Sequence, residues 1–448
     1  MLAVIASFTN YEDQGEEMNP KNELIPADSH ASTENNFDSI AQVSRRAFMT
    51  TAALAGAGVA TLTAAAQTRE ELLAGRQGDY ASDPGPANQP LIDENPNSHM
   101  PPFTDHGNMG PIWYSFDLAS RRVQNGGWTD QVTVRELPTS KSIAGVSMRL
   151  TANSIRELHW HTSDEWAIVL TGTTRITILQ PDGKMYIDDV GPGDLWYFPA
   201  GFPHSLQGIG PQGTEFLLVF NDGAFSEADT FLISESLVHL PPGVIQKNMG
   251  WSRENFNKLP QTQLYIFEGT EPPSLEEQKR ALGDKLETVN KYTYKLSEQR
   301  PDPVRAGGSV KIIDVDKFPV AKKLCAAQVT LKPGGMREVH WHPHSDEWQY
   351  YIHGKGRMTI ATTGAAARTM DFSANDVGFV PIMATHYVEN TGTEDLVFLE
   401  MLAAPHFIDV SMNAWIAGLP DNLATAHTKL PLNVIRSAPQ TALTILPK

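Results

Sequence analysis

Short apolar runs separated by turn sequences dominate the chain from about residue 113 onward. Runs of this kind, in which β-branched and aromatic residues are frequent, lie at 132–134, 147–150, 167–170, 175–178 and 216–220. Turn sequences stand between them, as in Pro181-Asp182-Gly183 and Pro192-Gly193-Asp194. Because the runs are short and evenly spaced, they favour a β-sandwich or β-barrel over alternating strands and helices.

A helical pattern is limited to segments that flank the β-rich regions. Ser274 and Glu277 have capping-box spacing after two prolines, which predicts a charged connector helix that ends at about Leu282. Strand-like runs resume over about 308–403, and the segment from 405 to about 419 predicts a short amphipathic helix before an irregular tail. The expected fold class is therefore all-β, with two tandem barrels and short flanking helices.

The amino-terminal part of the chain lacks the barrel pattern. Residues 67–112 are rich in Pro, Asn and Asp and show no periodicity, so they predict an extended arm. The sequence then divides into four parts: a leader of residues 1–66, the arm of 67–112, a first barrel domain of 113–255, and a last part of 256–448 that holds the connector helix, the second barrel and the tail.

The leader contains Ser44-Arg45-Arg46, followed by a weakly hydrophobic stretch of Ala, Gly and Thr that ends in alanines at 64–66. This arrangement resembles a twin-arginine export signal with its cleavage site. An alanine-rich helix of the mature fold is the alternative interpretation. The resemblance implies an exported protein, periplasmic or extracellular, that has no membrane anchor once the signal is removed.

Composition narrows the choice of partner. A hydrophobic fraction of 41% and a charged fraction of 19% are ordinary for a globular protein. The net charge of −17 argues against a nucleic-acid partner, and it means that an acidic substrate must be held by local positive charge. The single cysteine, Cys325, cannot form an intrachain disulfide and lies in an apolar run, so we expect a buried, inert thiol.

Histidines and glutamates recur in one pattern in both halves of the chain. The first set is His159, His161, Glu165 and His204, and the second is His340, His342, Glu347 and His386. Side chains two apart in a strand point to the same face, so each His-x-His pair can hold one ion. The ligand types do not select the metal: imidazoles suit Zn, Cu, Fe or Ni, whereas a carboxylate in octahedral geometry favours Mn or Fe.

The residues around the ligands repeat as well. Arg156-Glu157-Leu158 precedes the first set as Arg337-Glu338-Val339 precedes the second, and Gly172 and Gly354 follow the two glutamates at the same distance. This internal duplication resembles the cupin superfamily, in which His-x-His, Glu and a later His are spaced in this way. The resemblance implies two double-stranded β-helix, or jelly-roll, barrels.

Four positions depart from the cupin pattern. Asn153, Asn375 and Met383 stand where that superfamily usually has glycine, and Gly208 stands where its second motif closes with asparagine. Asparagine tolerates the left-handed backbone conformation that turns often need, so the first two changes are physically mild. Methionine is the less favourable of the replacements, because it is a bulky side chain in the rim loop of the second barrel.

Longer stretches resemble the bicupin oxalate decarboxylases in particular. They are Arg156 to His161, Asp189 to Pro199, Glu347 to Ile352 and His386 to Asn390. This resemblance implies manganese, two Mn²⁺ ions per chain, dioxygen as a co-catalyst, and oxalate as the substrate that is converted to formate and CO₂. It also implies a homo-oligomer, either a trimer or a hexamer.

The same resemblance implies roles for four further residues. Arg156 and Arg337 correspond to arginines that face the substrate, where a guanidinium neutralises a small carboxylate. Glu227, in the loop Ser226 to Thr230, corresponds to a general acid on a mobile loop, although the two residues after it differ from the family. Glu400 is the corresponding buried acid of the second half, within an apolar run that requires a partner for its carboxylate.

The second site lacks a loop like 226–230, so we expect turnover mainly at the first site and a structural, electron-storing or secondary role for the second. Trp160 and Trp341 either pack in the core or carry electrons between the sites. Two other functions stay open at this point. One is an oxalate oxidase that releases CO₂ and hydrogen peroxide, and the other is a non-catalytic, exported manganese-binding or storage cupin.

Overall fold

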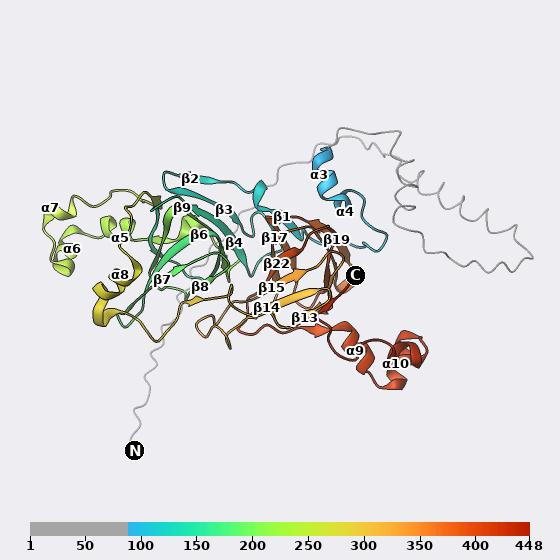
Figure 1. The fold of residues 1–448 in the computed structure, drawn as a ribbon. Coiled ribbons are helices and arrows are strands. Elements are labelled where there is room, and N and C mark those ends of the chain that lie inside the picture. The colour runs from blue at the N-terminus through green and yellow to red at the C-terminus, as the bar shows by residue number, and fades with distance from the viewer. Residues whose placement is uncertain (1–87) are drawn as a thin grey trace, which may run out of the picture. The chain divides into compact units, whose positions relative to one another are not determined.

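The computed structural model describes residues 88–448, whose strands form three β-sheets (Figure 1). The predicted leader and the first part of the predicted arm lie outside the described residues. Within 88–448, none of the helices has the length and apolar character needed to cross a membrane. The all-β fold class with two tandem barrels and short flanking helices is confirmed.

The first barrel is built around two long antiparallel strands. Its strands are β2 (Arg122–Gln124), β3 (Gly127–Val132), β4 (Ala144–Leu150), β5 (Ile155–Trp160), β6 (Glu165–Leu179), β7 (Met185–Val190), β8 (Leu195–Phe198) and β9 (His204–Phe220). β6 and β9 pair along nearly their whole length. The first half of β6 also pairs with β8 and its second half with β7, while β9 pairs with β4 and β5. The two long strands therefore belong to both layers of the jelly roll.

The second barrel repeats this plan with shorter strands. They are β13 (Val304–Arg305), β14 (Gly308–Ile313), β15 (Cys325–Leu331), β16 (Met336–Trp341), β17 (Glu347–His353), β18 (Gly356–Ala361), β19 (Ala367–Phe372), β20 (Asp376–Val380), β21 (Thr385–Asn390) and β22 (Leu396–Leu402). Here β17 and β18 replace the single strand β6, and β21 and β22 replace β9. The barrel consists of one sheet with β17 and β22 and a second sheet with β16, β18 and β21.

Strand β1 (Trp113–Ser115) precedes the first barrel in sequence but belongs to a sheet of the second. It pairs antiparallel with β20, Tyr114 facing Val377. The arm before it follows the same barrel, because Asp105 accepts hydrogen bonds from Thr369 and Asn97 donates to Asp371. Two short helices, α3 (Gln89–Glu94) and α4 (Pro96–His99), interrupt the predicted extended arm.

Short helices follow each barrel. After the first come α5 (Ile233–His239), α6 (Pro242–Met249), α7 (Arg253–Phe256) and the connector helix α8 (Leu275–Leu282), and after the second come α9 (Met412–Gly418), α10 (Asp421–Thr428) and α11 (Leu432–Arg436). The predicted capping box of α8 is present, with Ser274 and Glu277 bonded reciprocally. The small strands β10 (Phe231–Leu232), β11 (Ile266–Phe267), β12 (Thr293–Tyr294), β23 (Val410–Ser411) and β24 (Ile445–Leu446) lie between or beside these helices.

The helix expected from residue 405 begins only at Met412, where the Ser411 side chain accepts a hydrogen bond from the Ala414 amide. Residues 405–409 form a loop instead. The tail that was expected to be irregular contains α10 and α11, and each of these helices follows a proline, Pro420 or Pro431. A proline at the start of a helix costs no hydrogen bond, since the first amides have no partner within the helix.

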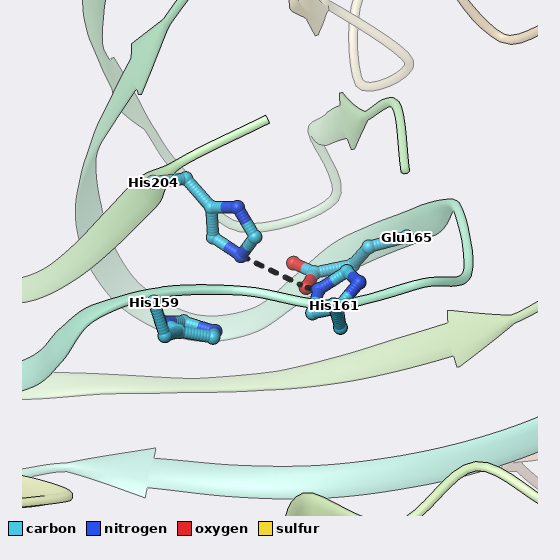
Figure 2. A group of neighbouring side chains, drawn as sticks. All are labelled: His159, His161, Glu165 and His204. Carbon is cyan, nitrogen blue, oxygen red and sulfur yellow. Dashed lines mark hydrogen bonds and ion pairs between the residues drawn. The ribbon is translucent and has the colours of Figure 1, made fainter. Parts of the chain in front are cut away.

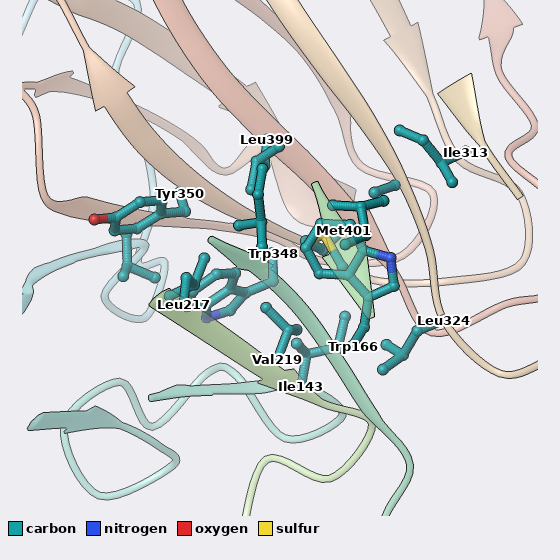
Figure 3. Close-up of a cluster of buried hydrophobic side chains, with 14 of the residues drawn as sticks. Ile143, Trp166, Leu217, Val219, Ile313, Leu324, Trp348, Tyr350, Leu399 and Met401 are labelled. Atoms are coloured by element: carbon teal, nitrogen blue, oxygen red, sulfur yellow. The ribbon is translucent and has the colours of Figure 1, made fainter. Parts of the chain in front are cut away.

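A shared hydrophobic core joins the two barrels (Figure 3). From the first barrel it includes Trp166, Leu217 and Val219, and from the second it includes Trp348, Tyr350, Leu399 and Met401. Each barrel also has an apolar interior of its own. The single cysteine, Cys325, is buried, and burial raises the pKa of its thiol, as expected for an inert group.

The three positions at which another residue replaces the usual glycine all lie in the left-handed region of backbone conformation. The φ angle is 63° at Asn153, 73° at Asn375 and 63° at Met383. The Met383 side chain is 63% exposed, so the rim loop keeps the turn that glycine would allow and places the methionine in solvent.

The shared core predicts a destabilising substitution. Gly145 on β4 lies against the indole ring of Trp348, and an added methyl group would overlap that ring. Gly145→Ala should therefore cost about 1–3 kcal/mol of stability by overpacking, and chemical denaturation should show a lower midpoint. Gly191→Ala is the matched control, because no atom lies within 4 Å of the position of its added methyl. Equal midpoints for the two variants would contradict the tight packing between the barrels.

Candidate metal centres

The first set of predicted ligands lies together inside the first barrel (Figure 2). His159 is on β5, His161 directly follows β5, Glu165 opens β6 and His204 opens β9. All four are buried, and their candidate ligand atoms lie within 4.8 Å of one another. His159 and His204 are neighbours across the pairing of β5 with β9. Three strands therefore meet at one point, as we expected from the spacing.

Backbone carbonyls hold the imidazoles of this centre in one orientation. Each Nδ1 atom lies close to one backbone carbonyl oxygen. His159 Nδ1 is 2.6 Å from that of Glu157, His161 Nδ1 is 2.7 Å from that of Ser163, and His204 Nδ1 is 2.8 Å from that of Phe202. A carbonyl only accepts, so Nδ1 carries the proton and Nε2 presents its lone pair to the centre. Burial, with the nearby Arg156 charge, lowers the pKa of His159 well below its usual range, which favours the neutral ligand.

The carboxylate of Glu165 is anchored by one oxygen and faces the histidines with the other. Trp196 Nε1 donates to Oε1 at 2.7 Å, while Oε2 lies 3.1 Å from His161 Nε2 and 3.6 Å from His204 Nε2. Burial alone raises the pKa of Glu165, but the contacts with these two imidazoles outweigh it and lower that pKa. Glu165 is therefore held as a carboxylate, the form that coordinates a metal ion.

The second set forms the same arrangement in the second barrel. His340 is on β16, His342 follows it, Glu347 opens β17 and His386 lies on β21, all of them buried. Their Nδ1 atoms face the backbone carbonyls of Glu338, Ile408 and Ala384 at 2.7, 2.9 and 3.0 Å, respectively.

Carboxylate anchoring is also repeated in this centre. Gln349 Nε2 donates to Glu347 Oε1 at 2.7 Å, and Glu347 Oε2 lies 2.9 Å from His342 Nε2 and 2.8 Å from His386 Nε2. Burial lowers the pKa of His342, but contact with Glu347 and the nearby carboxylates raise it overall to about 9. Both donor sets suit a divalent cation, because the buried Nε2 atoms of His204 and His340 have no hydrogen-bond partner among the described residues.

A strand irregularity brings the predicted arginine to the same side as the ligands. Residues three apart on a regular strand face opposite sides, yet Arg156 and His159 are both buried in the barrel. The pairing of β5 with β9 shifts register between these two residues. The pairing of β16 with β21 shifts in the same place, between Arg337 and His340. A β-bulge therefore turns each arginine inward.

The loop that carries Glu227 lies against Arg156. The Glu227 carboxylate accepts from Arg156 Nη2 at 3.0 Å and from the Tyr265 hydroxyl at 2.7 Å. Arg156 Nη2 also donates to Thr230 Oγ1, and its guanidinium carbon lies 4.3 Å from the centre of the Tyr265 ring. The loop is thus in a closed position, with the predicted acid inside and Ala228 and Asp229 exposed.

A cavity of about 170 Å³ borders the outer side of this loop. Its lining includes Glu227, Gln131, Arg122 and Arg135. The lining also includes Glu136, so the carboxylates of Glu136 and Glu227 offset the charge of the two arginines. The cavity is therefore mixed in charge.

In the second centre, Arg337 contacts two carboxylates. Its Nε donates to Glu400 Oε1 at 3.2 Å, and its Nη2 donates to Asp409, a residue of the loop before α9. Asp409 also lies 3.3 Å from His342 Nδ1. Burial raises the pKa of Glu400 in spite of the attraction of Arg337. No loop with the sequence pattern of 226–230 was expected at the second centre, but the loop 405–409 brings a different acid, Asp409, to it.

Sequence reasoning missed Tyr265 and Asp409. Neither residue lies in a repeated motif, and each comes from a segment outside the barrel strands. The sequence offered one indication that later segments contact the barrels: Glu157 and Glu338 occupy the same position in the two halves. Glu157 accepts hydrogen bonds from the amides of Ser234, Leu264 and Tyr265, and Glu338 accepts from Ser411 and from the amides of Leu443 and Thr444. These buried carboxylates attach the later segments to the barrels.

The two tryptophans between the paired histidines are partly exposed and lie outside the hydrophobic cores of the described residues. Trp160 stacks on Phe231 with ring centroids 5.5 Å apart. Trp341 meets Trp415 edge to face at 5.7 Å. Each ring thus packs against the segment that follows its barrel.

Comparison with known proteins gives a consistent result. The cupin family matches the chain over residues 115–257 and 294–436. Oxalate decarboxylase OxdC of Bacillus subtilis is 48% identical over 337 residues, which cover 75% of this chain and 87% of that protein. A probable oxalate decarboxylase of Arthroderma benhamiae is 38% identical over 356 residues, 78% of this chain and 87% of the relative.

Solved structures agree with these relatives. A structure of Bacillus subtilis oxalate decarboxylase, studied for its Mn(II) centres, aligns with a TM-score of 0.78 and 45% identity over 81% of this chain and 96% of that one. Another structure of oxalate decarboxylase, which describes its substrate binding mode, aligns with a TM-score of 0.77 at the same identity and coverage. Given the duplicated barrels, the two His₃Glu groups and this similarity, the chain belongs to the bicupin oxalate decarboxylase family of the cupin superfamily.

Proposed function

We propose that the chain converts oxalate to formate and CO₂, with two Mn²⁺ ions per chain and with dioxygen as a co-catalyst. The observation that carries this proposal is the closed first centre, where a buried arginine and a buried acid lie beside three histidines and a glutamate. The named oxalate decarboxylases, similar over three quarters of the chain or more, support the choice of substrate. Hydrogen oxalate and one proton give formic acid and CO₂, so there is no net oxidation.

The first centre holds the groups that this reaction needs. His159, His161, Glu165 and His204 would hold manganese, which supplies a redox-capable cation with positions open to a carboxylate. Arg156 neutralises the charge of that carboxylate through charge-assisted hydrogen bonds. Its Nε atom is buried and has no hydrogen-bond partner among the described residues, so one donor is available to a substrate oxygen.

Glu227 is the general acid in this proposal. Loss of CO₂ from oxalate that has given up one electron leaves a one-carbon radical anion, which needs one electron and one proton to become formate. A bound manganese ion with dioxygen would supply the one-electron oxidation and its reversal, and Glu227 delivers the proton that forms the new C–H bond. Tyr265 and Arg156 position the Glu227 carboxyl through the hydrogen bonds described above.

The position of Glu227 favours a decarboxylase over an oxalate oxidase. An oxidase would remove a second electron and yield peroxide, which requires that the radical is not protonated first. Here the acid lies inside the closed loop and contacts the substrate-facing arginine. A storage cupin would need neither this acid nor a buried arginine. The residues that depart from the family, Ala228 and Asp229, are exposed.

We assign turnover mainly to the first centre and a structural or electron-storing role to the second, which contains Arg337 and Glu400. We also propose a homo-oligomer, either a trimer or a hexamer. Exposed apolar side chains on the helices that follow each barrel, or between those helices, support an association: Leu240, Val244, Trp251, Trp415, Leu423 and Val434. Sedimentation velocity would measure the size of the assembly.

Removal of one histidine from each centre should separate the two metal ions. His204→Ala and His386→Ala should each lower the manganese content from two ions per chain to one, measured by elemental analysis. His204→Ala should also abolish formate production, because it acts on the first centre. His353→Ala is the control, since this histidine is exposed and belongs to neither group. Two bound ions in His204→Ala would contradict the assignment.

Loss of the acid should change the product. Glu227→Gln keeps the shape of the side chain but removes the carboxyl proton, so formate production should fall by about 10²-fold while peroxide per oxalate consumed increases. Formate dehydrogenase and peroxidase assays measure the two products. Asp229→Asn changes a neighbouring exposed carboxylate and should leave both yields unaltered. An unchanged formate yield in Glu227→Gln would remove Glu227 from its role.

We further propose export through the twin-arginine pathway to the periplasm or the cell exterior. Replacing Arg45 and Arg46 together by lysine should leave the full-length precursor in the cytoplasm of a bacterium that has this pathway, as detected by fractionation and immunoblotting. Arg69→Lys, which lies after the alanines at 64–66, should not alter export. If the unaltered chain stays in the cytoplasm at its full length, the export proposal is wrong.

A further inference from the structure

The two centres hold their arginines in the same way at two of the three guanidinium nitrogens. Arg156 Nη1 donates to the carbonyl of Tyr265, and Arg337 Nη1 donates to that of Thr444, both at 3.4 Å. Each Nη2 contacts an acid from the segment after its barrel, Glu227 in the first centre and Asp409 in the second. Asp409 is therefore the counterpart of Glu227 at the second arginine.

The third guanidinium nitrogen, Nε, has a different environment in the two centres. Arg156 Nε is buried and no described residue accepts a hydrogen bond from it. Arg337 Nε donates to both oxygens of Glu400, at 3.2 and 3.4 Å, and Nη2 also contacts Glu400 at 3.4 Å. The side chains of Arg337 and Glu400 are 1% and 0% exposed. The face of the guanidinium that is free in the first centre is thus occupied in the second.

Strand pairing identifies the residue that matches Glu400 in the first barrel. The ligand Glu347 pairs with Leu402, and two residues before it Glu400 pairs with Gln349. The ligand Glu165 pairs with Phe220, and two residues before it Leu218 pairs with Ala167. Leu218 is also buried, at 2% exposure. An apolar side chain in the first centre therefore stands where a carboxyl group stands in the second.

We propose that the Glu400 carboxyl group is a built-in stand-in for a substrate carboxylate, which keeps oxalate out of the second centre. Leu218 leaves the matching space beside Arg156 free for a small dicarboxylate. This inference rests on the proposed function, and it assigns Glu400 a specificity role in place of a catalytic one.

The larger number of carboxyl groups in the second centre also opposes the binding of oxalate there. The first centre combines Arg156 with the carboxyl groups of Glu165 and Glu227, whereas the second combines Arg337 with those of Glu347, Glu400 and Asp409. An oxalate anion that approaches the second centre would have to displace Glu400 from Arg337 and leave that carboxyl group buried without its partner. Leaving a buried polar group unpaired is costly, so the anion is excluded.

Oxalate stoichiometry tests the inference on the full-length, manganese-loaded chain. Equilibrium dialysis with radiolabelled oxalate under argon avoids turnover. We expect one oxalate per chain for the parent, two for Glu400→Leu, and one for Glu400→Gln, whose amide oxygen still accepts from Arg337 Nε. Elemental analysis must give two manganese ions in each protein.

Other outcomes separate the possible failures. Two oxalates bound by the parent, one bound by Glu400→Leu, or two bound by Glu400→Gln would each overturn the stand-in role while the proposed activity remains. A parent chain that binds no oxalate would refute the proposed function and this inference together.

A reciprocal substitution tests the same idea if Glu400→Leu does not fold. Leu218→Glu places a carboxyl group beside Arg156 and should lower the stoichiometry from one oxalate to none, with two manganese ions retained. Leu218→Met, which has a similar volume, should still bind one. Retention of one oxalate by Leu218→Glu would overturn the inference, since a carboxyl group at this position would then not exclude the substrate.

Discussion

The hydrogen bond between each imidazole Nδ1 and a backbone carbonyl is the interaction on which both centres depend. It fixes the tautomer and the ring orientation of the histidines, so that the Nε2 lone pairs converge on one point. Five of the six carbonyls belong to the ligand-bearing strands or to the residues next to them, as with Glu157 and His159, and the sixth is that of Ile408 in the loop 405–409. Fold and ligand geometry are therefore coupled directly. A barrel is well suited to this task, because its sheet holds the backbone that positions the rings.

Much of the fold and all eight ligands could be predicted, because both depend on local patterns. The spacing of two between His159 and His161 places these side chains on one face, and the duplication removes the ambiguity of a single occurrence. The inward position of Arg156 could not be derived from strand geometry, since the bulge between it and His159 has no clear sequence mark. Only the resemblance to a family pointed to it.

Other parts depend on contacts between distant segments. Tyr265 and Asp409 reach the centres from connections that have no periodic pattern, and the buried carboxylates Glu157 and Glu338 attach those connections to the barrels. The helices of the tail were missed because their short apolar patterns are weak, although Pro420 and Pro431 marked where they begin. Duplication thus preserved the metal ligands while the residues around the two arginines diverged.

Strand β1 has a consequence for how the chain is assembled. It is synthesised before the first barrel, yet it pairs with β20, whose residues emerge only after most of the chain has been made. The edge strand of the second barrel can therefore pair only after the whole first barrel has been synthesised. Pairing over such a sequence distance is slow to form. The two halves of this duplication are consequently not interchangeable or separable units, and a cut between them would leave the second half without its edge strand.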